Sequence, residues 1–377
     1  MAQHRSHLME ILRRHSVAQK VISAPLADNG LADEVRFPFL ALVGQMEMKL
    51  ALLLSLVNRN VGGVLLIGPR GTGKTTAVRG LVELMPTVTR SLCPYGCTEA
   101  AVEALGIDAI CADCAKKYAA GESLTATEPM RLIELPLNSR LEDVVGGINE
   151  RVAIEQQKVQ LQRGILSYAD QNMLYIDEVN LLDDAIINAI LDAAAQGMFT
   201  VRRGAMSATY QSRLFLVGSM NPEEGKLRPQ IQDRFGLRVV VRGLTDAADR
   251  LEAYRRAVAY QQNRHQFAAE WRFETEQATA EIQAARERLS RVTFAPDVEK
   301  TGLRWVQELH IESHRAEITM LEAARAYAAL DERDTATLDD LRVVAPMALR
   351  QRESTFITDY MAKETDYDHQ IGDIISG

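Results

Sequence analysis

A glycine-rich stretch that opens directly off an apolar run constrains the fold of this chain more than any other feature. Residues 68–75 read GPRGTGKT and fit the pattern G-x-x-x-x-G-K-[ST], and the run VLLI at 64–67 precedes them. The glycines let successive backbone N–H groups face phosphate oxygens, and a following helix adds the positive end of its dipole. The order strand, loop, helix therefore predicts a nucleotide-binding P-loop in a parallel α/β sheet.

We assign the nucleotide to this loop and to the start of the helix that follows it. Lys74 is expected to reach the β- and γ-phosphates of ATP, and the Thr75 hydroxyl is expected to bind the accompanying Mg²⁺. The complete set of expected contacts in the loop is Gly68, Pro69, Arg70, Gly71, Thr72, Gly73, Lys74, Thr75 and Thr76.

Two later apolar runs also end in polar residues. The run MLYI at 173–176 leads into Asp177, which would complete the nucleotide and Mg²⁺ contacts, and Glu178, which would orient and deprotonate an attacking water. Two acids after a strand can also simply begin a solvated loop, but the P-loop upstream favours catalysis. The run LFLVG at 214–218 leads to Asn221, which can reach the γ-phosphate or serve as a turn residue.

The pattern of elements divides the chain into three parts. Residues 1–35 form an extension that is flexible or contacts a partner. Residues 36–244 hold four or five strands separated by helices, and include a polar, Gln-rich stretch expected to be helical up to about Gln162. Residues 245–377 are expected to form a helical linker and an all-helical lid, and TLDD at 337–340 predicts the start of its final helix.

All four cysteines lie in a segment of about 87–131 that looks inserted into the α/β pattern. The spacings Cys93-x3-Cys97 and Cys111-x2-Cys114 allow two tight turns to supply four thiolates to a tetrahedral Zn²⁺. Four reduced cysteines in a surface insertion, or a disulfide if the insertion is oxidised, are the alternatives. The first pair is looser than C-x2-C, but the clustering of every cysteine favours zinc.

Charge and hydropathy exclude some classes of function. The net charge of −8 gives no global attraction to nucleic acid, so a nucleic-acid partner is not expected. No apolar stretch approaches the roughly 20 residues that a membrane span needs. The first apolar patch is short and interrupted by Glu10, which disfavours a secretory signal. We therefore expect a cytoplasmic protein.

Several stretches match a family beyond these general patterns. The chain resembles the AAA+ ATPases and, within them, the I-subunit family of magnesium chelatase, the motor for inserting Mg²⁺ into protoporphyrin IX in chlorophyll and bacteriochlorophyll biosynthesis. The resemblance covers most of residues 36–352. Its most specific stretches, besides the P-loop, read FPF at 37–39, VGQ at 43–45, YIDEVNLL at 175–182, NPEEGKLRPQ at 221–230 and DRFGL at 233–237.

The resemblance implies roles that spacing alone does not. Asn221 corresponds to sensor 1. Arg234 corresponds to the arginine finger, which is presented to the nucleotide of the neighbouring subunit, with Asp233 beside it at the interface. Arg315 is the candidate for the sensor 2 arginine of the lid. The resemblance also implies that a hairpin around residues 202–203 projects before sensor 1.

The resemblance further implies an assembly. Members of the magnesium chelatase I-subunit family form an ATP-dependent ring, usually a hexamer. They work with an integrin-like AAA+ partner subunit and a porphyrin-binding catalytic subunit. Two other functions are kept open: a MoxR-like AAA+ chaperone that remodels a protein carrying a metal-binding adhesion-type domain, and a DNA-acting ring related to helicases. The negative net charge disfavours the DNA-acting ring.

Overall fold

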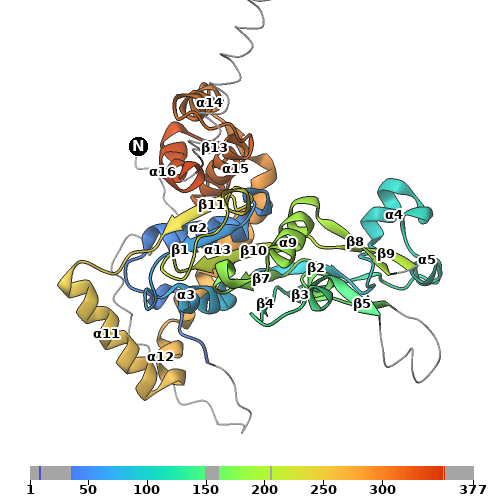
Figure 1. Cartoon of the computed structure of the whole chain (residues 1–377), viewed down its shortest axis with the longest axis horizontal. Helices are drawn as coiled ribbons and strands as arrows, with labels where there is room; N and C mark the ends of the chain where they lie inside the picture. The colour runs from blue at the N-terminus through green and yellow to red at the C-terminus, as the bar shows by residue number, and fades with distance from the viewer. Residues whose placement is uncertain (1–7, 10–34, 149–160, 204–205, 351, 353–377) are drawn as a thin grey trace, which may run out of the picture.

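A parallel β-sheet forms the centre of the molecule (Figure 1). The structure, a computed structural model, describes residues 8–9, 35–148, 161–203, 206–350 and 352. All neighbouring strands of the sheet run parallel, so their carboxyl ends meet at one edge. The strands lie in the order β11 (Leu237–Val240), β1 (Val64–Ile67), β10 (Phe215–Met220), β7 (Met173–Ile176) and β4 (Leu132–Leu135).

Helices cover both faces of this sheet, which explains its continuous apolar runs. Every residue of β1, β7 and β10 is buried, as expected for strands packed on both sides. Along β1, Leu65 and Ile67 pack with helix α9 (Asp184–Gln196). The alternate residues of the strand face the opposite core, which includes helix α3 (Lys74–Gly80).

Helix α2 (Met46–Val57) is buried more completely than its sequence suggests. Ten of its residues are buried, including the polar Lys49 and Ser55. The reason is that helices α13 (Arg272–Arg288) and α15 (Arg315–Leu330) pack against it from outside the sheet. The Lys49 ammonium donates a hydrogen bond to the carbonyl of Leu42, and burial, with a smaller contribution from Arg256, lowers the pKa of Lys49 to about 8.

Between β11 and residue 350 the described chain is almost entirely helical. The long helices expected from composition are present, and Thr337 and Asp340 form the predicted capping box of the last one. One parallel pair, β12 (Thr293–Phe294) with β13 (Thr335–Ala336), interrupts them. The helices are α11 (Ala247–Gln262), α12 (Arg264–Glu270), α13 (Arg272–Arg288), α14 (Val298–Glu308), α15 (Arg315–Leu330) and α16 (Leu338–Leu349).

Within the N-terminal extension, Leu8 and Met9 are described and both are buried. The backbone N–H of Leu8 donates to Oε2 of Glu281 on α13, at 2.8 Å. This short part of the extension is therefore packed against the helical portion of the chain.

Three antiparallel strand pairs in the described residues form an arm that extends from one side of the sheet (Figure 1). The predicted hairpin is present as β8 and β9. The helical prediction up to Gln162 is wrong at its end, because Leu161–Arg163 pair with a neighbouring strand; residues 149–160 lie outside the described residues. The pairs are β2 (Thr87–Ser91) with β3 (Thr125–Pro129), β5 (Gly146–Ile148) with β6 (Leu161–Arg163), and β8 (Met198–Arg203) with β9 (Met206–Gln211).

Candidate active site

A pocket of about 220 Å³ lies at the carboxyl edge of the sheet, where β1, β7 and β10 end. It is lined by P-loop residues 70–76, by Asp177 and Glu178 after β7, and by residues 219–221 at the end of β10. The parallel register of the strands thus brings together side chains that lie far apart in the sequence.

The glycines of the P-loop leave open space inside it. Gly71 and Gly73 have φ angles of +76° and +85°, and a Cβ atom at either would meet no atom within 4 Å. The Lys74 ammonium donates to the carbonyls of Gly68 and Pro69, at 2.7 and 2.8 Å. Burial lowers the pKa of Lys74, although three nearby carboxylates oppose this shift. The loop is therefore an open cradle with a cation at its base.

Three hydroxyl groups surround the carboxylate of Asp177. The Thr75 hydroxyl lies 3.2 Å from Oδ2, the Tyr175 hydroxyl lies 2.9 Å from Oδ1, and the Ser219 hydroxyl also donates to Oδ1. Burial raises the pKa of Tyr175, so its hydroxyl stays neutral. A carboxylate and a hydroxyl oxygen side by side fit a Mg²⁺ ion, which prefers oxygen ligands.

Sequence reasoning missed Tyr175 and Ser219. Both are fully buried, and both follow apolar residues in central strands. The available signal was a hydroxyl-bearing side chain near the carboxyl end of each strand, in runs that are otherwise apolar.

An ionic network joins the expected base to the end of β10. Glu178 has a left-handed backbone with φ of +51°, and its N–H donates to the Ser219 hydroxyl at 3.3 Å. Its carboxylate lies 3.6 Å from the guanidinium of Arg70, which also pairs with Glu224. The amide of Asn221 donates to that Glu224 at 3.1 Å. Glu224 is thus a further polar group of the site that the sequence did not single out.

The two arginines implied by resemblance lie together, but outside this pocket. Arg234 and Arg315 line a separate cavity of about 650 Å³, between the core and the lid helix α15. Arg234 donates to Oδ1 of Asp192 on α9, at 2.6 Å. Neither arginine is among the residues that line the P-loop pocket. Their catalytic roles stay predictions.

Asp233 connects the core to the lid. Its carboxylate accepts hydrogen bonds from Arg352 at 2.5 Å, from Ser313 at 2.9 Å and from Arg315 at 3.3 Å. The guanidinium of Arg238 lies 3.6 Å away. Burial opposes ionisation of Asp233, but the Ser313 hydroxyl and these guanidiniums hold its pKa below the ordinary value.

The sequence of this chain is similar to those of known proteins. A family described as "Magnesium chelatase, subunit ChlI" matches residues 146–242, and an AAA lid domain matches residues 306–371. The "Magnesium-chelatase subunit ChlI homolog" of Methanocaldococcus jannaschii is 40% identical over 331 residues, which cover 87% of this chain and 89% of that protein. The chain belongs to the magnesium chelatase subunit ChlI family.

Other members of the ChlI family are similarly related. The "Magnesium-chelatase 38 kDa subunit" of Acidiphilium rubrum is 38% identical over 84% of this chain and 90% of its own length. The chloroplastic subunit ChlI-2 of Arabidopsis thaliana is 37% identical over 84% of this chain and 75% of its own. A solved structure of a putative ATPase from Cytophaga hutchinsonii shares the fold, with 20% identity, a TM-score of 0.52 and 83% of each chain covered.

Two further observations concern this ChlI family chain outside its nucleotide pocket. The four cysteines predicted as zinc ligands come together, with all four sulfur atoms within 4.8 Å of one another. Among the described helices, none combines the length and the apolar character needed to cross a membrane.

Proposed function

We propose that this chain is the ATP-hydrolysing AAA+ motor subunit of a magnesium chelatase, which drives Mg²⁺ insertion into protoporphyrin IX in chlorophyll or bacteriochlorophyll biosynthesis. Such a motor would be part of a ligase that forms metal–nitrogen bonds. The observation that carries the proposal is the convergence of the P-loop, Asp177 and Glu178 on one pocket in a chain of the ChlI family. Together these residues bind a nucleotide, hold its metal and activate water.

Each residue of the pocket has a distinct task. The Lys74 ammonium would bind phosphate oxygens, and Thr75 with Asp177 would hold a Mg²⁺ that neutralises charge on the phosphates. Glu178 accepts a proton from the attacking water. The guanidinium of Arg70 lies 3.6 Å from the carboxylate of Glu178 and would help to position it.

The position of Arg234 supports hydrolysis between subunits. Because Arg234 and Arg315 line a cavity apart from their own P-loop, a neighbouring chain is needed to place an arginine finger at the γ-phosphate. Such a guanidinium is worth about 10³ to 10⁵ in rate. We infer a homo-oligomeric ring, in the family's hexameric form, in which sensor 1 is Asn221 and sensor 2 is Arg315.

The driven reaction requires further chains. Relatives are named as subunits of magnesium chelatase, which supports companion chains for this protein as well. By family resemblance they are an integrin-like AAA+ subunit and a porphyrin-binding catalytic subunit. Loss of the γ-phosphate removes the charge that holds the finger of one subunit against its neighbour, and the resulting movement is what the partners receive.

The decisive test is porphyrin fluorescence. This protein is mixed with the two companion chelatase subunits, protoporphyrin IX, Mg²⁺ and ATP, and Lys74→Ala serves as the control. An ATP-dependent shift to the spectrum of Mg-porphyrin, absent with the control, is the expected result. Hydrolysis of ATP without metal insertion would instead favour the MoxR-like chaperone function, and a chain that hydrolyses no ATP in any assembly would overturn the motor assignment.

A further inference from the structure

The segment between β2 and β3, residues 92–124, is a separate small unit, which we call the cysteine module. Its helices contribute almost nothing to a core: α4 (Glu99–Leu105) buries no residue, and α5 (Ala112–Ala119) buries only Cys114. The buried cluster of the module consists of Cys97, Cys114 and Leu124. A unit this small, with so little apolar burial, usually needs disulfides or a metal to keep its structure.

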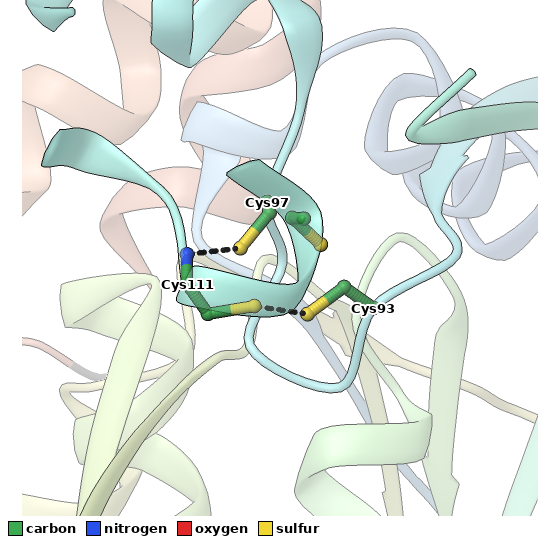
Figure 2. A group of neighbouring side chains, drawn as sticks. Cys93, Cys97 and Cys111 are labelled. Atoms are coloured by element: carbon green, nitrogen blue, oxygen red, sulfur yellow. Dashed lines mark hydrogen bonds between the residues drawn. The ribbon is translucent and has the colours of Figure 1, made fainter. Parts of the chain in front are cut away.

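The sulfur atoms of the module have the spacing of ligands to one metal ion. In Figure 2 the side chains of Cys93 and Cys97, which flank one turn, converge with that of Cys111. The Sγ atoms of Cys93 and Cys111 are 3.6 Å apart, and all four sulfurs lie within 4.8 Å of one another. Zn–S bonds of about 2.3 Å place the corners of a tetrahedron about 3.8 Å apart. A disulfide joins sulfurs only in pairs, at about 2.05 Å, and does not explain why four converge.

Backbone amides point at two of these sulfurs. The N–H of Tyr95 donates to Sγ of Cys93 at 3.4 Å, and the N–H of Cys111 donates to Sγ of Cys97 at 3.3 Å. Gly96 makes the first turn possible, with φ of +78°. A thiol is a weak acceptor, whereas hydrogen bonds to an ionised acceptor are markedly stronger. The two amides therefore suit thiolates bound to a cation.

The first cysteine turn also packs on the β8–β9 hairpin. The ring of Tyr95 stacks on that of Tyr210 in β9, with centroids 5.6 Å apart and planes 10° apart. Tyr210 in turn contacts Phe199 of β8, at 5.7 Å. A Cβ atom on Gly96 would lie 2.2 Å from the side chain of Gln211, so only glycine allows the turn to approach this closely. The residues that contact the hairpin, Tyr95 and Gly96, therefore lie between Cys93 and Cys97.

We propose that the four cysteines hold one structural Zn²⁺, and that this ion fixes the turn at residues 93–97 and through it braces the β8–β9 hairpin. The hairpin connects α9 to β10, the strand that Asn221 directly follows. Zinc would therefore order an element between two parts of the nucleotide site without touching the nucleotide. This stabilisation of the hairpin by zinc, which we call the brace, does not depend on which reaction the motor drives.

The metal is tested on the full-length protein, purified under reducing conditions, by elemental analysis and thiol titration. About one zinc per chain is expected. Cys97→Ser and Cys114→Ser should lose it, whereas Lys116→Ala, on the exposed side of α5, should retain it. One iron per chain would overturn the choice of zinc. Absence of metal would overturn the site, and the thiol count would then distinguish four reduced cysteines from a disulfide.

The brace is tested by hydrogen exchange of the amides in β8 and β9. Removal of zinc by a chelator should speed their exchange, and returning zinc should restore it, while the P-loop helix is unaffected. Tyr95→Ala should keep its zinc yet exchange about three- to tenfold faster in the hairpin, the scale of one stacked aromatic pair. Tyr118→Ala on α5 is the matched control. Equal exchange with and without zinc would overturn the brace.

Discussion

Two aspartates, Asp177 and Asp233, define two contrasting regions of the molecule. The carboxylate of Asp177 is surrounded by neutral hydroxyls, from Thr75, Tyr175 and Ser219. The carboxylate of Asp233 is surrounded by guanidiniums, with those of Arg352 and Arg238 almost fully buried. The first arrangement leaves the negative charge available to a cation, whereas the second neutralises it.

The difference shows that the same residue type can bind a metal ion at one position and stabilise the fold at another. Hydroxyls orient a carboxylate without cancelling its charge, so the Asp177 region is prepared for Mg²⁺. Buried guanidiniums need a counter-ion, so Asp233 stabilises the contact between core and lid. Arg234, the residue after Asp233, is thereby held on a face that its own nucleotide does not occupy.

The largest expected effect tests whether the Asp233 region acts on a neighbour. Arg234→Ala should lower steady-state ATP hydrolysis by about 10³ to 10⁵, because the arginine finger is lost while the P-loop remains. Lys74→Ala should be inactive for the opposite reason. Mixed rings contain interfaces with an intact P-loop from one variant and an intact Arg234 from the other, so mixing should restore part of the activity. If no ratio restores it, Arg234 does not act between subunits.

The next effect tests the Asp177 region alone. Glu178→Gln should reduce hydrolysis by about 10² to 10⁴, the usual contribution of a general base, while ATP binding and assembly persist. Glu224→Gln is the matched control, because Glu224 is the other carboxylate paired with Arg70. Equal losses in the two variants would mean that the base is not identified by its place after β7.

For the free energy of unfolding, substitution of Asp233 should have a larger effect than substitution of Asp177. Asp233→Asn leaves two buried guanidiniums without their anion and should lower the free energy of unfolding by about 2 kcal/mol, less than a fully buried pair because Asp233 is partly exposed. Asp177→Asn should change it by less than about 1 kcal/mol, because the groups that hydrogen-bond to Asp177 are neutral hydroxyls. Urea unfolding of both variants measures this contrast, and a larger loss at Asp177 would reverse it.

Acid should act on the same contact. The folded-state pKa of Asp233 is lowered, so its stabilisation is fully present above the unfolded pKa of about 3.9 and is lost as the pH falls through the folded-state value. The acid-induced decline in stability should therefore be shallower in Asp233→Asn than in the unmodified protein.

The parts of the site that sequence predicted are those fixed by local order. A strand, a glycine-rich loop and a helix place Lys74 and Thr75 without help from distant residues, and Asp177 follows a strand that a continuous apolar run identifies. Helix α2 shows the limit of this reasoning. Ten of its residues are buried because α13 and α15 also pack on it, and no local pattern reveals which C-terminal helices will return to the core.

The parts that sequence did not predict depend on long-range contacts. Arg352 lies 119 positions from Asp233. Tyr175 on β7 contacts Thr75, which follows β1, although β10 lies between these two strands. Leu161–Arg163 became a strand because β5 offered a partner. In each case the side chain or segment is ordinary on its own, and only the fold gives it a role.

The smallest expected effect tests whether hydroxyls prepare Asp177 for its metal. Tyr175→Phe removes one donor to Oδ1 but leaves that of Ser219, so the carboxylate stays charged and partly oriented. The Mg²⁺ concentration for half-maximal hydrolysis should rise about tenfold, the lower end for groups that orient a metal ligand. Ser219→Ala should raise it further, because Ser219 also accepts from the N–H of Glu178. An unchanged Mg²⁺ dependence in both variants would mean that Asp177 needs no orienting hydroxyls, and the contrast with Asp233 would rest on charge alone.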